Sequence, residues 1–380
     1  MKRAWNLAAP TGPGRVPTIP VPALSVGYMP QLDTLRAFAV LFVIASHWLP
    51  GNWVVRHLPL GMMGVTLFFV LSGFLITRIL LQGRAAASDV GGSRLKVLGH
   101  FYVRRTLRIF PAYYLVLLLL WVSGMPDFRP DTAWYGFYAA NVLFYNAQAW
   151  IGPAPHLWTL SVEEQFYLLW PLTILFVPDR LLGKFIVGTV LLGPMSRGLL
   201  FYFSDGTPAA ADFLHVLMPT CLDCFGLGAL LALGRSRGGF LHGSWMWRGF
   251  VTANLASMLW LLDSYSMTAV LLFRLNVSVL ALMLVARGSV GFSKAIRPVM
   301  ENRILVYLGR ISYGLYLYHL FVPGMLGWTG LPDRFGYVPT LAMQFALVVL
   351  LASASWYGFE RPLKLIRPRF ASGDRASAMA

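Results

Sequence analysis

Long apolar stretches recur along the whole chain, and short segments between them hold most of its Lys and Arg residues. About 20 apolar residues are enough for a helix to cross the hydrocarbon core of a membrane. Ten predicted spans follow, at 31–50, 60–82, 109–124, 157–177, 182–203, 214–233, 248–263, 267–286, 303–323 and 337–358. The pattern therefore predicts an all-α, multi-pass integral membrane protein with about ten transmembrane helices.

The basic residues predict the orientation of these spans, because Lys and Arg concentrate in short cytoplasmic loops. Alternate connecting segments are basic, whereas the opposite loops hold only Arg56, Arg129 and Arg334. We therefore expect both termini in the cytoplasm. Residues 1–30 are predicted to be a flexible tail, 31–362 the transmembrane domain and 363–380 a basic tail.

Composition supports the membrane prediction and narrows the partners. Of the residues, 57% are hydrophobic and 12% are charged, against about 25% charged in soluble domains. The net charge is +16, and the basic residues that produce it lie mostly between apolar spans. We therefore interpret them as a topology signal and as phosphate contacts rather than as a nucleic-acid-binding surface. Cys221 and Cys224 are interpreted as small buried residues in preference to a redox or metal pair, and no His or Cys spacing suggests a metal site.

The first span, LDTLRAFAVLFVIASHW at residues 32–48, carries ionisable side chains. Arg36 and His47 are eleven positions apart, which places them within about 20° of one helix face and about 16 Å apart along it. An Arg or Asp in a span costs at least about 2.5 kcal/mol, so such residues usually face a partner, a cavity or a substrate path. We expect Arg36 towards the cytoplasm, held by Asp33, and His47 towards the outer face.

A basic helix is predicted after the second span, in HFYVRRTLRIFPAYYL at residues 100–115. Arg105 and Arg108 are three positions apart and would present adjacent guanidinium forks at the cytoplasmic interface. Such forks match phosphate oxygens. Contact with anionic lipid is an equally good interpretation of this cluster.

The fourth span begins HLWTLSVEEQFYLLWP at residues 156–171 and contains two carboxylates. Adjacent side chains cannot share a helix face, so we expect one of Glu163 and Glu164 to face the bundle centre. Glu163 is expected at the depth of His47, where a carboxylate orients an imidazole that acts as a general base. A structural ion pair or an interhelical hydrogen bond is the alternative.

Weaker hypotheses concern other polar residues in the spans. Gly61, Gly64, Ser72 and Gly73 predict close helix packing. Asp223 is expected to be an interhelical partner rather than a catalyst. Ser312, Tyr316 and His319 fall on roughly one helix face, and His319 is interpreted as a core histidine in preference to a cavity residue.

The chain resembles the membrane-bound acyltransferase-3 family of bacterial integral-membrane O-acyltransferases. The resemblance rests on ordered segments: LDTLRAFAVLFVIASHW, GVTLFFVLSGFLITRIL, FYVRRTLRIFPAYYL, LWTLSVEEQFYLLWP, ISYGLYLYHLFV and the terminal FERP. Its Arg-x10-His pattern falls on Arg36 and His47, its R-x-x-R pattern on Arg105 and Arg108, and its Glu on Glu163. Supporting roles would fall on Asp33, Glu164, Tyr167, Ser72, Asp223, Tyr316 and His319.

The resemblance implies acyl-CoA, usually acetyl-CoA, as a co-substrate from the cytoplasm, with no tightly bound cofactor. The expected reaction is acyl transfer to a hydroxyl of a carbohydrate or glycolipid at or across the bacterial inner membrane. The chain ends about 20 residues after the last span, which resembles the branch without a fused esterase-like domain and leaves a separate periplasmic partner open. A transporter or flippase of a lipid-linked or acylated carbohydrate is the alternative function.

Overall fold

The computed structural model describes residues 28–89, 91–125, 128–204, 213–236, 249, 251–257 and 267–366. Within these ranges every regular element is a helix, which confirms the all-α part of the predicted fold class. The long helices are α1 (Pro30–Trp48), α3 (Leu60–Asp89), α4 (Arg94–Val122), α7 (Trp158–Phe176), α8 (Asp179–Phe203), α12 (Met267–Gly288) and α18 (Tyr337–Ser355).

Shorter helices connect or extend the long ones. Between α1 and α12 they are α2 (Trp53–His57), α5 (Thr132–Gly136), α6 (Ala140–Ala147), η1 (Pro155–Leu157), η2 (Pro219–Cys221) and α10 (Leu222–Ser236). After α12 they are α13 (Arg297–Met300), α14 (Arg303–Arg310), α15 (Ser312–Tyr318), α16 (Phe321–Gly327), α17 (Leu331–Phe335), the π-helical η3 (Trp356–Glu360) and α19 (Arg361–Ile366).

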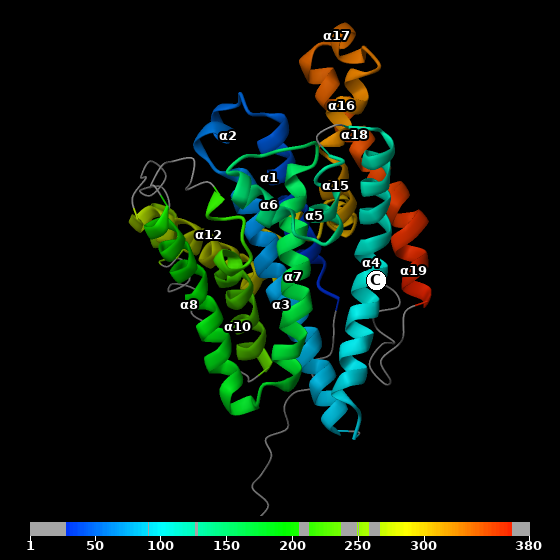
Figure 1. Cartoon of the computed structure of the whole chain (residues 1–380). Coiled ribbons are helices and arrows are strands. Elements are labelled where there is room, and N and C mark those ends of the chain that lie inside the picture. The colour runs from blue at the N-terminus through cyan, green and yellow to red at the C-terminus, as the bar shows by residue number, and fades with distance from the viewer. Residues whose placement is uncertain are drawn as a thin grey trace, which may run out of the picture.

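Helix α3 lies at the centre of the bundle and packs against α1, α4, α7, α10 and α12 (Figure 1). Glycines permit the closest of these crossings. A Cβ on Gly64 would collide with the carbonyl oxygen of Ala39 on α1, and one on Gly73 with that of Phe225 on α10. This confirms the close packing that the glycines of this span predicted.

Several helices present apolar side chains outwards, as expected in lipid. In the described ranges, four helical stretches are long and apolar enough to cross a membrane by length and composition: Leu60–Asp89, Arg94–Val122, Asp179–Phe203 and Tyr337–Leu363. Their outer faces expose residues such as Leu118, Leu191 and Leu350. The protein is therefore a membrane protein. The count of ten spans and the orientation of the termini stay predictions. Half of the span at 248–263 and most of both predicted tails lie outside the described residues.

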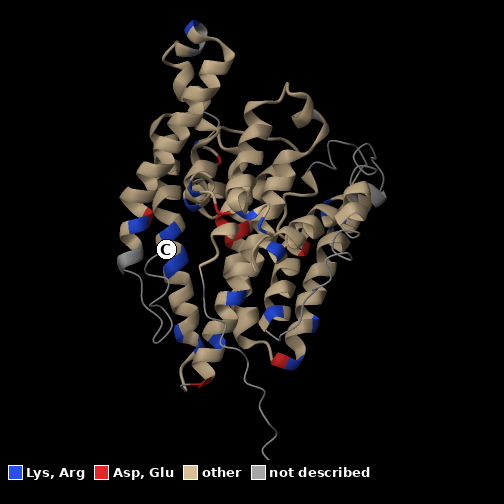
Figure 2. Cartoon of the chain, turned by 180° about the vertical axis from the view of Figure 1, so that it is seen from behind, with Lys and Arg blue, Asp and Glu red and all other residues tan. Residues whose placement is uncertain are grey.

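Charged residues are unevenly distributed between the two ends of the molecule (Figure 2). Lys and Arg are frequent from the middle of the bundle to the end where α3 finishes and α4 and α8 begin. At the opposite end, the tip formed by α17 carries Arg334. We call the first of these the basic end.

Three predicted spans have different boundaries in the structure. The span at 303–323 is not one helix but α14, α15 and α16. The chain leaves helical geometry at Ile311, just after Gly309 meets the backbone of Asp33 closely. Helix α4 starts at Arg94 rather than 109, because its polar first half is invisible to an apolar window. The span at 214–233 becomes regular only at η2 and α10.

Candidate functional site

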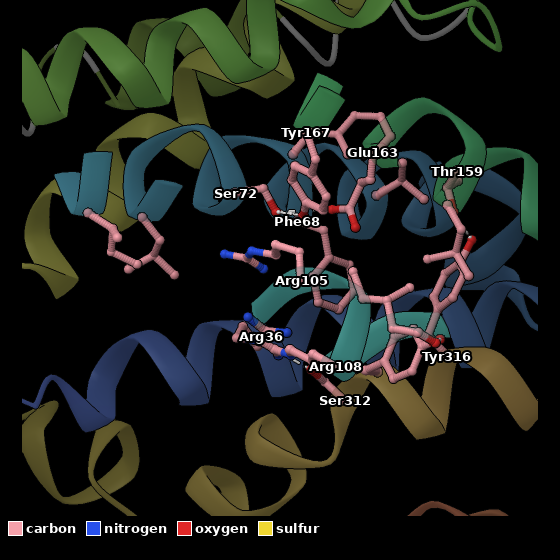
Figure 3. Close-up of a pocket in the computed structure, with 17 residues that line it drawn as sticks. Arg36, Phe68, Ser72, Arg105, Arg108, Thr159, Glu163, Tyr167, Ser312 and Tyr316 are labelled. Atoms are coloured by element: carbon pink, nitrogen blue, oxygen red, sulfur yellow. Dashed lines mark hydrogen bonds between the residues drawn. The ribbon is translucent and has the colours of Figure 1, made fainter. Parts of the chain in front are cut away.

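A cavity of about 180 Å³ opens between α1, α3, α4, α7 and α15. Its apolar wall comes mainly from α3, including Phe68, Phe69 and Leu75. Its polar lining consists of Arg36, Ser72, Arg105, Arg108, Thr159, Glu163, Tyr167, Ser312, Tyr313 and Tyr316. Figure 3 shows the three arginines towards one end of this space and Thr159 with Tyr316 at the other. Five helices from different parts of the sequence thus build one polar chamber.

The arginine end brings together both predicted basic motifs. Arg36 Nε donates to Ser312 Oγ at 3.2 Å. The guanidinium carbon of Arg105 lies 5.0 Å from the ring centroid of Tyr167, a cation–π contact, and Arg108 lines the same cavity one turn further along α4. None of the ion pairs within 4.0 Å among the described residues involves these three arginines. The chamber therefore offers guanidinium groups to an anion.

A chain of hydrogen bonds crosses the cavity wall from α7 to α3. Tyr167 donates its hydroxyl to Ser72 Oγ at 3.1 Å, and Ser72 donates to Glu163 Oε1 at 3.0 Å. Ser72 is therefore part of the polar lining in addition to lying beside the packing residue Gly73. The chain holds the Glu163 carboxylate in the same chamber as the arginines, where it offsets part of their positive charge.

The two adjacent carboxylates of α7 separate as their spacing predicted. Glu163 lines the cavity, whereas Glu164 is not among the residues that line it. Neighbouring positions on a helix are rotated by about 100°, so Glu164 lies on another face of α7, where it interacts electrostatically with Tyr113 and Tyr114 of α4. The structure thus places Glu163, rather than Glu164, in the site.

The far end of the cavity is lined by a hydroxyl pair. Thr159 Oγ1 and the Tyr316 hydroxyl lie 2.5 Å apart, and Tyr316 donates to the carbonyl oxygen of His156 at 2.8 Å. Tyr316 and Ser312 line the cavity together, as their spacing predicted. The ring of Tyr316 also lies 5.5 Å from that of His319, which joins the cavity to a histidine cluster.

This cluster consists of His47, His156 and His319. His319 Nε2 lies 3.1 Å from His47 Nδ1, and the rings of His156 and His319 meet edge to face at 5.1 Å. His319 is fully buried, as expected of a core histidine. His156 was not predicted as a site residue, although an imidazole at the start of an apolar span was a usable indication.

Hydrogen bonds assign the neutral tautomers in the cluster. His319 Nδ1 lies 2.6 Å from the carbonyl oxygen of Tyr316, so that nitrogen donates and Nε2 accepts. His47 Nδ1 lies 2.9 Å from the carbonyl oxygen of Val43 and faces the accepting His319 Nε2, so it carries a proton. The remaining nitrogen, His47 Nε2, is left with a free lone pair on an exposed side chain.

The predicted pairing of His47 with Glu163 is wrong. Glu163 contacts Ser72, and His47 contacts Val43 and His319. The reason is depth: His156, which belongs to the cluster, marks the level of His47, and Glu163 follows it by seven residues, or about 10 Å of helix. Glu163 therefore lies nearer to the level of Arg36.

Asp33 attracts Arg36 electrostatically, as expected, but among the described residues no ion pair within 4.0 Å joins them, and the close contacts of Asp33 are with other side chains. Asp33 accepts from the Tyr28 hydroxyl at 2.6 Å and lies 4.0 Å from Arg310 Nε. Arg310 is the last residue of α14, and Ser312 is the first residue of α15. This short segment therefore supplies partners to both Asp33 and Arg36. Sequence reasoning could not see this because it treated 303–323 as one helix.

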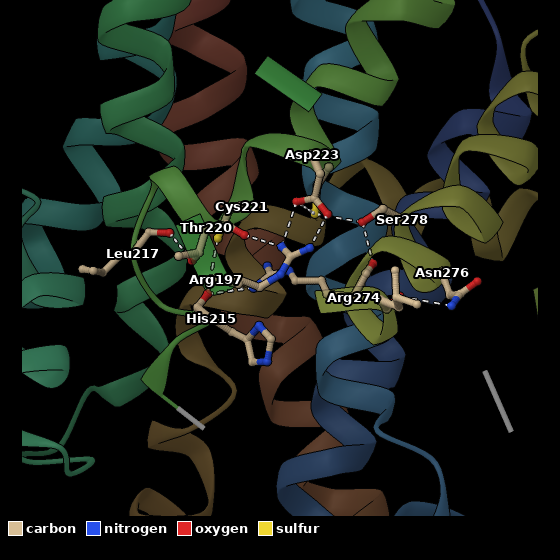
Figure 4. Close-up of polar contacts among 11 residues, drawn as sticks. Arg197, His215, Leu217, Thr220, Cys221, Asp223, Arg274, Asn276 and Ser278 are labelled. Atoms are coloured by element: carbon tan, nitrogen blue, oxygen red, sulfur yellow. Dashed lines mark hydrogen bonds and ion pairs between the residues drawn. The ribbon is translucent and has the colours of Figure 1, made fainter. Parts of the chain in front are cut away.

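Asp223 forms the interhelical contact that its place in an apolar stretch predicted. Its carboxylate makes a bidentate pair with Arg197 of α8, at 2.9 and 3.1 Å, and both side chains are fully buried (Figure 4). Cys221 and Cys224 are buried free thiols beside it, as expected. Arg197 had no predicted role, although an arginine within an apolar span indicates a buried partner.

Comparison with known families shows where the chain belongs. The sequence profile of the acyltransferase domain family, Acyl_transf_3, matches residues 29–359. The chain belongs to this acyltransferase family. The match spans α1 to η3, and so includes every residue of the cavity and of the histidine cluster.

Curated relatives of this chain are named as O-acetyltransferases. A Staphylococcus aureus (strain MSSA476) protein provisionally named an O-acetyltransferase is 28% identical over an alignment covering 89% of this chain and 57% of the relative. The peptidoglycan O-acetyltransferase OatA of Listeria monocytogenes is 33% identical over 46% of this chain and 29% of its own length. This acyltransferase-family chain spans little more than half of the first relative. No solved structure matches it.

Proposed function

We propose that the protein is an O-acyltransferase that moves an acyl group, in the first place acetyl, from acyl-CoA to a hydroxyl of a carbohydrate or glycolipid at the bacterial inner membrane. Three lines support the proposal: membership of the acyltransferase family, relatives named as O-acetyltransferases, and the arginine-lined cavity. The relative named for peptidoglycan makes a cell-wall or surface polysaccharide the first acceptor to test.

The observation that carries the proposal is the grouping of Arg36, Arg105 and Arg108 in one chamber. Guanidinium forks bind phosphate oxygens in pairs, and each such charge-assisted bond is about twice as strong as a neutral one. In the proposal the arginines hold the CoA phosphates, and the pantetheine arm follows the apolar wall of α3 towards Tyr316. The thioester then arrives beside the histidine cluster.

In the proposed chemical step, His47 Nε2 takes the proton from an acceptor hydroxyl. The hydroxyl oxygen bonds to the thioester carbonyl carbon, the carbon–sulfur bond breaks, and CoA leaves as the thiol once the proton returns to its sulfur. General-base catalysis of this kind contributes about 10² to 10⁴ in rate. His319 supports the step by accepting from His47 Nδ1, which keeps Nε2 free.

The test is acyl transfer in membranes that contain His47→Ala, with His57→Ala as a matched control. Both imidazoles place Nδ1 near the carbonyl oxygen four residues earlier, at 2.9 and 2.8 Å, but only His47 contacts His319, whereas His57 lies on α2 and packs on Trp53. With labelled acetyl-CoA and polysaccharide acceptor, we expect His47→Ala to lose at least about a hundredfold in rate and His57→Ala to keep it. Full activity of His47→Ala would remove His47 from the mechanism.

The same preparation separates transfer from transport. A transporter of an acylated carbohydrate would move its cargo without consuming acyl-CoA. If the wild-type protein neither binds CoA nor transfers label, but moves a lipid-linked or acylated sugar across sealed vesicles, the acyltransferase proposal fails in favour of transport.

A further inference from the structure

A second, smaller cavity contains two arginines that the proposed mechanism does not use. It has a volume of about 60 Å³ and lies between α3, α10 and the end of α12. Its lining is Phe74, Arg78, Ala232, Arg235 and Ser289. A volume of about 10 to 15 Å³ holds one water, so this space admits a group the size of a tetrahedral anion.

The two guanidinium groups are poorly neutralised. Arg78 and Arg235 repel each other across the cavity, and among the described residues none of the ion pairs within 4.0 Å involves either of them. The hydrogen bond found for Arg78 runs from Nη1 to the sulfur of Met29 at 3.3 Å, and a thioether is a weak acceptor. Two positive charges thus share one small cavity without a carboxylate.

Arg235 caps the end of α12 with only some of its hydrogen-bond donors. Its Nη2 donates to the carbonyl oxygen of Ala286 at 3.2 Å, close to the C-terminal end of α12. Its Nε is buried without a hydrogen-bond partner, and a guanidinium has five N–H donors. Capping α12 therefore leaves donors of Arg235 free to bind a ligand in the cavity.

The second cavity lies near the first one along α3. Leu75 and Ile79 of α3 line the first cavity, and Arg78 lies between them in sequence. At about 100° per residue, Arg78 is about 60° around α3 from Leu75. Its partner Met29 directly precedes α1, the helix that carries Arg36. A ligand bound at Arg36 that extends towards the start of α1 would come within reach of Arg78.

We propose that Arg78 and Arg235 form a second anion site that binds one phosphate group, separate from the arginines of the main cavity. Two forked guanidinium groups facing one small space suit a phosphate monoester or diester. Two sources fit this chemistry. One is the ribose 3′-phosphate of CoA, in which case the site rests on the proposed function and extends its donor recognition. The other is the headgroup of an anionic lipid.

The test compares CoA with 3′-dephospho-CoA. Binding is measured with the purified protein in nanodiscs of neutral phosphatidylcholine, for the wild type and the double variant Arg78→Gln with Arg235→Gln. Glutamine keeps a polar N–H donor but removes the positive charge and the guanidinium fork. Arg287→Gln is the matched control, because Arg287 is exposed at the same end of α12 and does not line the cavity. The double variant Arg78→Lys with Arg235→Lys keeps both charges without the forks.

If the phosphate belongs to CoA, the wild type and Arg287→Gln bind CoA about tenfold more tightly than dephospho-CoA, which is about 1.4 kcal/mol. The Gln double variant loses this preference and leaves the affinity for dephospho-CoA unchanged, and the Lys variant keeps part of it. Variants of Arg105 or Arg108 weaken both ligands alike, which separates the two sites.

If the phosphate belongs to a lipid, the CoA preference is the same in all variants. The Gln double variant then retains less phosphatidylglycerol or cardiolipin through purification than Arg287→Gln does, as counted by native mass spectrometry. Unchanged nucleotide preference together with unchanged lipid retention would overturn the proposal and leave the two arginines as helix caps. If the wild type binds neither form of CoA, the proposed donor fails, and lipid retention still decides the phosphate site.

Discussion

At the residue scale, the two adjacent carboxylates of α7 lie in different surroundings. Glu163 accepts a hydrogen bond from Ser72 inside the cavity, and Glu164 lies on another face of the same helix turn. The sequence could say that only one of them would face the centre. Which one it is depends on the rotation of α7 against α3 and α4, and that is set by packing.

Glu163→Gln should lower the rate of acyl transfer by at least about tenfold, whereas Glu164→Gln should change it by less than about twofold. Glutamine keeps an acceptor for Ser72 but removes the negative charge that balances the arginines, and charge interactions are strong in a cavity shielded from water. Steady-state rates with varied acetyl-CoA measure the effect. Equal losses in both variants would show that the placement of these carboxylates does not govern activity.

At the residue scale too, the spacing between Arg36 and His47 predicted their shared helix face but not the contacts of His47. Its position eleven residues after Arg36 correctly indicated one helix face with a cation and an imidazole at different depths. Its partners, His319 and the nearby His156, come from segments more than one hundred positions away in the chain. No local sequence pattern relates these segments, so only the tertiary structure shows that the three histidines form a cluster.

At the element scale, the crossing of α3 and α10 depends on glycine. Cβ atoms on Gly73 or Gly228 would collide with backbone atoms of the other helix, namely Phe225 for the first and Val70 for the second. In a membrane, such small residues let helices approach closely and gain dispersion contacts. The crossing fixes α3, which supplies Ser72 and most of the apolar wall of the cavity.

Gly73→Ala should destabilise the protein by about 1 to 3 kcal/mol, the usual range for overpacking, because α3 and α10 would have to separate. Gly188→Ala is the matched control: it lies in α8, and a Cβ there meets no atom within 4 Å. That variant should be neutral or gain up to about 1 kcal/mol from helix propensity. Thermal unfolding in detergent measures both, and a stable Gly73→Ala would show that the crossing can relax.

The breaks between α14, α15 and α16 also belong to the element scale. They divide a predicted span into three pieces and let Arg310 contact Asp33 while Ser312 contacts Arg36. An apolar window averages over such breaks, because the residues on both sides remain apolar. The lining of the cavity by α15 was therefore beyond reach of the hydrophobic pattern, although its residues Ser312 and Tyr316 were named correctly as sharing a face.

At the scale of the whole molecule, the uneven distribution of Lys and Arg predicts the topology. The basic end holds the start of α8 with Lys184, and the opposite tip holds the connection between α16 and α17 with Thr329. The positive-inside rule places the basic end in the cytoplasm. The predicted donor would then reach the arginines of the main cavity from the cytoplasm.

Cysteine labelling checks this orientation in right-side-out membrane vesicles. A membrane-impermeant maleimide should react with Thr329→Cys directly and with Lys184→Cys only after permeabilisation. Both positions are exposed, and the native Cys221 and Cys224 are buried, so the background should be low. Labelling of Lys184→Cys in sealed vesicles, without labelling of Thr329→Cys, would reverse the predicted topology.

The sequence by itself determined that the protein is helical and that it belongs in a membrane, and it predicted Arg36, His47, Arg105, Arg108 and Glu163 as chemically important positions. These follow from hydropathy, charge and helical spacing, which are local properties of the chain. Tertiary structure decided that Glu163 joins the arginines rather than His47, that His319 and His156 surround His47, and that Arg78 and Arg235 face one cavity. Such contacts depend on the relative depth and rotation of helices far apart in sequence, and these are set by how side chains pack across the whole bundle.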